Sequence, residues 1–284
     1  MGDTFCGWYF RCRSGDRTVA LIPAAHTANG VRSGSLQIIS DAGNWLIPFS
    51  RENIRVSPDK PRAVLGKSVF RENGVWLDLY TDRLSVAGEL RFGPLSTLRY
   101  DVMGPFRYVP FMECRHSVAS MQHTINGSLR INETDYSFRD GMGYIEGDRG
   151  HSFPQQYAWT QCFFESGSLV LSVAEIPLGP LRFTGVICVI HFQGREYRLA
   201  TYLGAKAEKI RDGEIIIRQG RLALTAALLE KNAYFLKAPA SGAMTRSIRE
   251  NVSCRAKYRF SVEGRTVFAF ETEKAAFEFE YPSM

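Results

Sequence analysis

Two short stretches, Val-Trp-Leu-Asp-Leu-Tyr at residues 75–80 and Phe-Glu-Phe-Glu-Tyr at residues 277–281, carry the pattern that decides the fold. In each, apolar side chains stand at every second position, which is the period of a half-buried β-strand. Aromatic residues make up 12% of the chain, and Tyr and Phe favour such pleated surfaces. Similar runs recur along the sequence, broken by Gly, Pro, Asn or Asp. The sequence therefore predicts an all-β protein with few short helices.

Turn signals separate many of these runs. Four dipeptides predict hairpins, namely Asn73-Gly74, Asn126-Gly127, Asp212-Gly213 and Glu263-Gly264. The runs suggest roughly eight to ten strands on each side of residue 150, which is too many for one small barrel. We therefore expect two antiparallel β domains, residues 1–150 and residues 151–284.

Three segments have a less regular pattern. Residues 222–236 are rich in Ala and Leu, yet they lie between strand-like runs, so strand is favoured there over helix. Residues 243–250 follow Ser-Gly and are expected to form a short helix. The Gly-Met-Gly at residues 141–143 lacks the spacing and the following helix of a dinucleotide-binding loop, and we interpret it as a β-turn.

Composition excludes several classes of protein. Apolar residues make up 45% of the 284 residues and charged residues 23%, and the mean hydropathy is −0.16. These values are typical of a folded globular chain with a core. The net charge is +6, but the basic residues stand singly or in pairs, which argues against nucleic-acid binding. No apolar run approaches the ~20 residues of a membrane span, so no integral membrane segment is expected.

The cysteines and the first residues predict the cellular compartment of the protein. The six Cys form no C-x-x-C pair, and no apolar secretory segment follows the first residue. A cytoplasmic protein with reduced thiols is therefore expected. The sequence leaves the oligomeric state open.

Common catalytic motifs are missing from the sequence. The five His have no ligand-like spacing, and neither a G-x-S-x-G elbow nor a Walker loop is present. We therefore expect no metal and no cofactor.

Residues 103–163 are unusual, because ionisable side chains interrupt strand-like apolar runs. Such groups either face water or lie buried with partners. By the period of two, Glu146 and Asp148 share one strand face, and Trp159 and Gln161 share another. An apolar wall with a hydrogen-bonding group suits a hydrophobic ligand that has a polar end. Taken singly, His116 and His123 could also be ordinary structural histidines, and seven residues apart they would face opposite sides of a regular strand.

Several of these residues form a pattern that resembles a known protein family. Tyr-Ile-Glu-Gly-Asp-Arg-Gly at residues 144–150, then Ser-Phe-Pro at 152–154 and Trp-Thr-Gln-Cys at 159–162, resemble the central motif of the tocopherol cyclase family. His116, Ser120-Met121, His123 and the Ala-Pro at 238–239 match as well. The resemblance implies two lipocalin-like barrel or sandwich domains, a fold shared more distantly with carotenoid hydratases and Diels–Alder cyclases. It also implies catalysis without a metal or redox cofactor on a long apolar substrate.

The sequence departs from the family motif at three positions. Gly147 stands where the family usually has Lys, Arg149 replaces a Trp, and Phe163 replaces an Asn. These changes remove an aromatic wall and an amide and add a guanidinium, so they should reshape a pocket.

The resemblance implies acid-catalysed cyclisation, or hydration, of a lipophilic molecule such as a prenylated phenol or another isoprenoid. Glu146 or Asp148 is the expected proton donor, because two close carboxyls raise one another's pKa, and His116 is next in line. The side chains expected to contact the substrate are Glu113, Met121, His123, Tyr144, Arg149, Trp159 and Gln161. Among these, Tyr144 and Trp159 would face a cation, and Arg149 would attract an anionic head group. The alternative is a non-catalytic carrier of a hydrophobic molecule, which would need the same pocket but no turnover.

Overall fold

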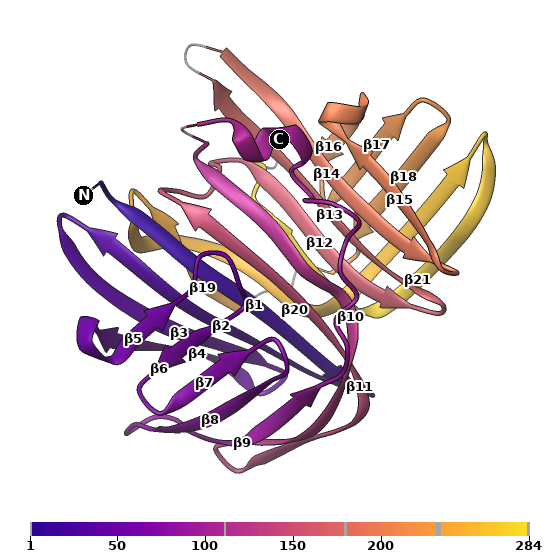
Figure 1. Ribbon diagram of the computed structural model, residues 1–284. Coiled ribbons are helices and arrows are strands. Elements are labelled where there is room, and N and C mark those ends of the chain that lie inside the picture. Colours follow the sequence, from indigo (N-terminus) through magenta and orange to yellow (C-terminus); the bar gives the residue numbers. More distant parts are fainter. Residues whose placement is uncertain (1, 111, 179–180, 231–233, 283–284) are drawn as a thin grey trace. The chain divides into compact units, whose positions relative to one another are not determined.

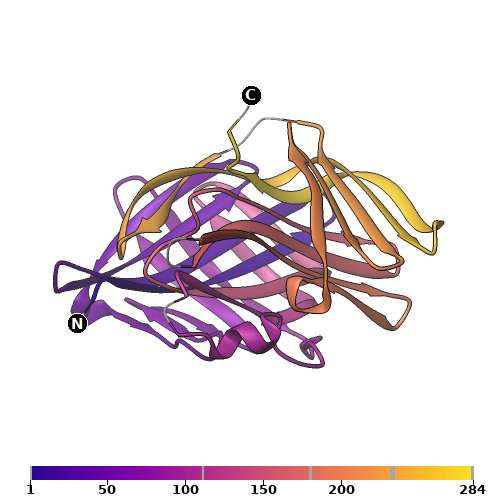
Figure 2. The same cartoon turned by 90° about the horizontal axis from the view of Figure 1, so that it is seen from above.

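The computed structural model describes residues 2–110, 112–178, 181–230 and 234–282. Strand accounts for 73% of the residues and helix for 4%, which confirms the predicted all-β fold. The helical pieces found in these ranges are three short 3-10 turns, η1 (Arg51–Asn53), η2 (Gly104–Tyr108) and η3 (Thr201–Leu203) (Figures 1 and 2). None of the helices described is long or apolar enough to cross a membrane.

The first sheet has 11 antiparallel strands and is nearly closed into a barrel. In spatial order its strands are β4 (Gly43–Ser50), β3 (Val31–Ser40), β2 (Arg17–Ala28), β1 (Thr4–Ser14), β11 (Thr134–Gly150), β10 (Cys114–Ile131), β9 (Ser85–Phe92), β8 (Gly74–Tyr80), β7 (Ser68–Arg71), β6 (Ala63–Leu65) and β5 (Ile54–Val56). The long β11 lies between β1 and β10, so the two halves of the sheet meet there (Figure 1).

The second sheet has 10 strands. Its order is β15 (Arg195–Ala200), β14 (Leu181–Phe192), β13 (Gly167–Leu178), β12 (Tyr157–Phe164), β21 (Arg265–Phe279), β20 (Ala243–Val262), β18 (Leu222–Leu228), β17 (Glu214–Gln219) and β16 (Lys206–Arg211), with β19 (Tyr234–Ala240) paired to β20.

The chain forms two compact units, and each takes segments from both halves of the sequence. Unit 1 comprises Met1–Asp101, Cys114–Phe153 and Leu236–Arg246, and unit 2 comprises Val102–Glu113, Pro154–Phe235 and Ser247–Met284. A short late segment of the chain is thus part of unit 1.

Each unit has its own apolar core. In unit 1, Phe10, Leu21, Phe70 and Ile145 are fully buried in one continuous cluster. The barrel closes tightly at Gly34 of β3, where an added Cβ would lie 2.8 Å from the side chain of Ile54. Only glycine fits there without movement of the neighbouring strand.

The second core has the same character. It contains Leu171, Ile217, Phe260 and Phe277, all fully buried. Phe164 packs beside it and stacks on Phe192, with ring centroids 5.9 Å apart. Inward-facing residues at alternate positions thus build both cores, as the period of two predicts.

The hairpins predicted at Asn73-Gly74, Asp212-Gly213 and Glu263-Gly264 are present. Of residues 222–236, for which strand was favoured, 222–228 form β18 and 234–236 belong to β19, while 231–233 lie outside the described residues. Asn126-Gly127 does not form a hairpin. It lies inside β10 at a shift of register, where an added Cβ on Gly127 would lie 2.1 Å from the Glu89 carbonyl oxygen. The pair therefore marks a bulge with a close approach of β9.

Two further expectations are wrong. Residues 243–250 are the start of strand β20, because strand pairing outweighs the weak helical propensity of this segment. The Gly-Met-Gly at 141–143 is not a turn but part of β11, paired with β1 and β10.

Candidate functional site

The candidate site lies on one face of β11. The strand alternates, so Tyr144, Glu146 and Asp148 share this face, while Ile145 points to the opposite side and joins the unit 1 core. This agrees with the predicted common face of Glu146 and Asp148. Tyr144 is fully buried and Glu146 is 6% exposed, so the sheet holds two polar groups out of contact with bulk water.

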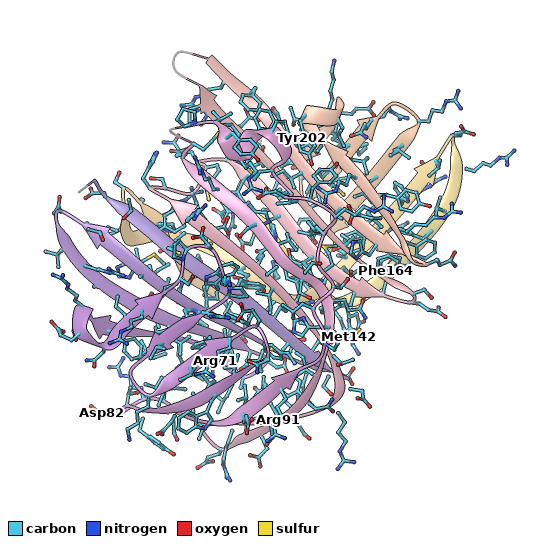
Figure 3. The ribbon with its side chains drawn as sticks, in the orientation of Figure 1. Arg71, Asp82, Arg91, Met142, Phe164 and Tyr202 are labelled. Atoms are coloured by element: carbon cyan, nitrogen blue, oxygen red, sulfur yellow. The ribbon has the colours of Figure 1, made fainter. Side chains whose placement is uncertain are left out.

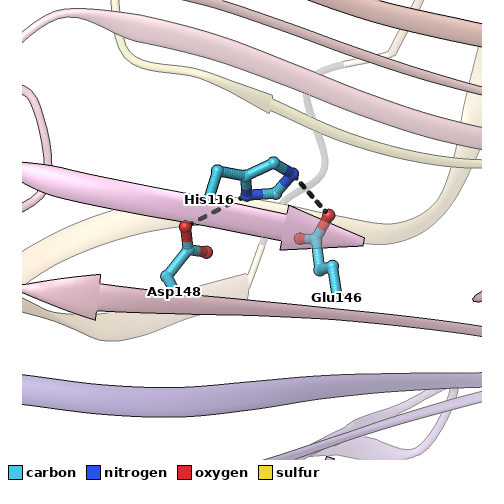
Figure 4. Close-up of side chains that lie close together, drawn as sticks. All are labelled: His116, Glu146 and Asp148. Atoms are coloured by element: carbon cyan, nitrogen blue, oxygen red, sulfur yellow. Dashed lines mark hydrogen bonds and ion pairs between the residues drawn. The ribbon is translucent and has the colours of Figure 1, made fainter. Parts of the chain in front are cut away.

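His116 of β10 brings the two carboxylates into one cluster (Figure 4). It stands opposite Asp148 in the strand register, with its Nδ1 3.0 Å from Asp148 Oδ1. Its Nε2 lies 3.4 Å from Glu146 Oε2. Each ring nitrogen therefore faces a carboxylate, which is the environment of a doubly protonated imidazolium.

The pKa of His116 reflects this environment. Burial alone would lower it, but the charges of Asp148 and Glu146, with smaller help from Asp101, raise the pKa of His116 to about 9. The imidazole is therefore protonated at neutral pH.

Two further groups hold the carboxylates in place. The Tyr144 hydroxyl donates a 2.6 Å hydrogen bond to Glu146 Oε2, and the Cys114 thiol lies 3.4 Å from Asp148 Oδ1. Burial, and then the charge of Glu146, raise the pKa of Tyr144 well above its usual value, so the phenol remains a donor. Each carboxylate beside His116 thus has a second partner that positions it through a hydrogen bond.

The Nε2 of His116 differs from the other polar atoms of the cluster. It is buried and makes no hydrogen bond in the described structure, although it lies within ion-pair distance of Glu146. Asp148 fixes the ring through the other nitrogen. A buried N–H that is oriented but not hydrogen-bonded is able to donate to a reacting group on a substrate.

His123 occupies a different environment on the same strand. It is paired with Gly143, so its side chain lies on the core face of the sheet, where its ring packs 4.7 Å from that of Phe92. Its Nδ1 is 3.0 Å from Ser120 Oγ, and burial lowers the pKa of His123 to about 4. The two histidines therefore face opposite sides of the sheet, as predicted, and His123 is neutral.

The departures from the family motif have local explanations. An added Cβ on Gly147 would lie 2.6 Å from the ring of Trp8, whose indole N–H donates a 2.7 Å hydrogen bond to the Ser57 carbonyl. No side chain at position 147 fits unless Trp8 moves. The Arg149 guanidinium donates to the Pro58 carbonyl at 3.2 Å and forms an ion pair with Asp59 at 2.6 Å. It is therefore held on the loop after β5.

The remaining predicted residues are spread over both units. Met121 is fully buried on β10 in unit 1. Glu113, Trp159 and Gln161 belong to unit 2. The unbroken register of β12 puts Trp159 and Gln161 on one face, as expected, and they are 5% and 0% exposed.

The same cluster offers the atoms of a metal site. One ligand atom from each of His116, Glu146 and Asp148 lies within 4.8 Å of the others. Such a set of one nitrogen and two carboxylates is chemically able to bind a divalent ion. Binding would require the imidazole to lose a proton, which the raised pKa opposes.

Sequence reasoning did not find two of these contacts. Cys114 and Trp8 lie far from Asp148 and Gly147 along the chain and meet them only through strand pairing. In the sequence, Gly147 stands where the tocopherol cyclase family usually has Lys. This difference was the one indication that a large side chain packs against residue 147.

No protein-family model matches the sequence, and neither does any curated protein. Among solved structures, CghA with Sch210972 aligns over 98% of this chain and 88% of its own, with a TM-score of 0.64 and 10% identity. The structure of CghA alone has a TM-score of 0.62 at the same identity and coverage. The chain therefore has the all-β fold of CghA.

Proposed function

We propose that this protein is a cyclase-type enzyme for a lipophilic small molecule, and that His116 supplies the proton. The observation that carries the proposal is the buried Nε2 of His116. Asp148 orients the ring, and Nε2 makes no hydrogen bond in the described part of the chain, with Glu146 Oε2 3.4 Å away. A protonated imidazole held in this way is a general acid. The likeness in fold to CghA, which has been solved with the small molecule Sch210972, is compatible with this role.

The choice of donor differs from the one suggested by the sequence. Because the charges of Asp148 and Glu146 raise the pKa of His116, the proton of the cluster is held on the imidazole. The carboxylates then orient the donor and stabilise positive charge that develops on the substrate. We therefore assign the proton to His116 and the supporting roles to Glu146 and Asp148.

The balanced reaction for a prenylated phenol is an isomerisation. His116 Nε2 transfers a proton to the olefin, the phenol oxygen bonds to the tertiary carbon, and the phenol proton returns to the neutral imidazole. Substrate and product have the same formula, and the site needs no oxidant or reductant. Since an imidazolium with a pKa of about 9 is a weak acid toward carbon, a substrate whose carbonyl oxygen accepts the N–H is the easier case.

The test separates turnover from binding. Wild type, His116→Gln and Asp148→Asn are incubated with a panel of prenylated phenols and carbonyl-bearing polyenes, and cyclised products are measured by mass spectrometry. Loss of a general acid typically costs about a hundred- to ten-thousand-fold in rate, so His116→Gln should bind the substrate but barely convert it. His191→Gln is the matched control, because that histidine also faces a carboxylate, Glu196, in unit 2.

Two results would contradict the proposal. Full activity of His116→Gln would show that His116 is not the proton donor. Saturable binding by the wild type without conversion of any substrate would favour the non-catalytic carrier instead.

A further inference from the structure

Unit 1 contains a groove that shares no residue with the His116 cluster. Its volume is about 1010 Å³, and it lies where β5, β6, β7 and the turn after β7 meet the start of β3 and η1. Its lining consists of five arginines, one glutamate and eight uncharged residues.

Five arginines of this lining are brought together by the fold. They are spread over forty positions of the sequence. Each comes from a different part of the fold: Arg32 from β3, Arg51 from η1, Arg55 from β5, Arg62 from the loop before β6, and Arg71 from β7. In the sequence these residues stand singly, which is why the charge pattern gave no sign of a basic site. Figure 3 shows Arg71 at its place on unit 1.

The lining carries little negative charge. Its one carboxylate is that of Glu72, which accepts a 2.7 Å hydrogen bond from Arg62 Nε. Within the described part of the chain, the side chains of Arg55 and Arg71 have neither a hydrogen bond nor an ion pair. The lining therefore has five positive charges against one negative charge. Like charges gathered in a concave surface raise its potential and concentrate anions there.

The floor of the groove is apolar. Val64 and Val69 lie on the same strand face as Arg55 and Arg71, and Val64 is 37% exposed. The buried Ile54, Ala63 and Phe70 belong instead to the unit 1 core on the opposite face. A ligand in the groove would therefore meet guanidinium groups at the rim and hydrocarbon below. Guanidinium forks match the geometry of phosphate oxygens, which they bind through paired hydrogen bonds.

We propose that this groove binds an organic phosphate, with the phosphate group on Arg55 and Arg71 and an apolar part of the same molecule on the floor. This site is independent of the proposed cyclase activity. The phosphate could belong to a soluble phosphate ester or to a lipid head group, and the experiment separates these two sources.

The test uses the full-length chain and three probes. Binding of inorganic diphosphate and of dodecyl phosphate is measured by titration calorimetry at fixed ionic strength, and phosphatidylcholine vesicles with and without phosphatidic acid are used in a flotation assay. The double variant Arg55→Gln/Arg71→Gln should bind the soluble probes at least about tenfold more weakly, because charge-assisted hydrogen bonds are lost. The control is Arg83→Gln/Arg139→Gln, which removes the same charge from exposed arginines of unit 1 outside the groove.

Tighter binding of dodecyl phosphate than of diphosphate supports the apolar floor, and binding that weakens with salt supports the arginine rim. If the protein floats with the vesicles that contain phosphatidic acid but does not bind dodecyl phosphate, the phosphate that it recognises belongs to a lipid head group. Equal affinity of the two double variants, or the absence of saturable binding of every probe, overturns the proposal.

Discussion

His116 and His123 lie on the same strand, and their surroundings change their pKa values in opposite directions. Carboxylates raise the pKa of His116 to about 9, and burial lowers that of His123 to about 4. We expect NMR titration of the ring protons to show His116 charged and His123 neutral throughout the range from pH 5 to 8. A midpoint near 6.5 for His116 would mean that its contacts with the carboxylates are not formed in solution.

The same shift predicts how stability depends on pH. The folded pKa of His116 lies above the unfolded value of ~6.5, so its stabilising effect is complete below that pH and is lost as the pH rises through about 9. The difference in free energy of unfolding between wild type and His116→Gln should therefore shrink from pH 6.5 to pH 9. Urea denaturation across this range measures it, and a constant difference would contradict the ion pairing.

Gly147 and Trp8 provide a test of packing at the site. Gly147→Ala should destabilise the protein by about 1–3 kcal/mol, because its Cβ would overlap the indole ring. In the Trp8→Ala background the same change should cost much less, which a double-mutant cycle measures. Gly2→Ala, which meets no atom within 4 Å, is the control, and an equal cost in both backgrounds would exclude the overlap.

What the sequence could predict about the site follows from local periodicity. Alternation along a strand correctly put Glu146 and Asp148 on one face and His116 and His123 on opposite faces. It could not predict that His116 lies opposite Asp148, because the register between β10 and β11 contains shifts and depends on contacts across the whole sheet. Arg149 was expected to attract a ligand, yet it faces Asp59, about ninety residues earlier in the chain.

At the scale of elements, the side chain of Gln37 links β3 to β19. Gln37 is buried, donates a 2.9 Å hydrogen bond to the Lys237 carbonyl and accepts one of the same length from the Lys237 N–H. Gln37→Ala would leave both backbone groups without these partners and should cost about 2 kcal/mol or more. Glu133→Ala, an exposed change at the turn between β10 and β11, is the control. An equal small effect of both substitutions would show that this connection contributes little.

The strands were predictable where hydrophobic alternation is regular, and the errors have a common cause. Residues 243–250 and the Asn-Gly at 126–127 have local preferences for a helix and for a turn. The first segment begins the long β20, which pairs with β19, and the second lies in β10 between β9 and β11. Pairing across the sheet satisfies their backbone groups and outweighs the local preference. For Asn126-Gly127, local sequence does not show that β9, more than thirty residues earlier, provides a partner.

For the whole molecule, we expect metal removal to have no effect on stability. The positive charge beside Glu146 and Asp148 is supplied by protonated His116, so these carboxylates have a cation without a metal ion. Treatment with a strong chelator should leave the melting temperature unchanged within a degree or so. A drop of several degrees that zinc reverses would instead identify His116, Glu146 and Asp148 as metal ligands.

The composition of unit 1 has a consequence for synthesis of the protein. Its last segment, Leu236–Arg246, leaves the ribosome long after the strands that it joins, and Gly242 packs so closely that a Cβ there would lie 2.1 Å from the Thr27 carbonyl oxygen. The first 153 residues contain every strand of the first sheet, but unit 1 is incomplete until residue 246 has left the ribosome. A ribosome-bound chain stalled after residue 200 should be cut by protease within residues 1–50, whereas one stalled far enough downstream to expose residue 246 should be protected.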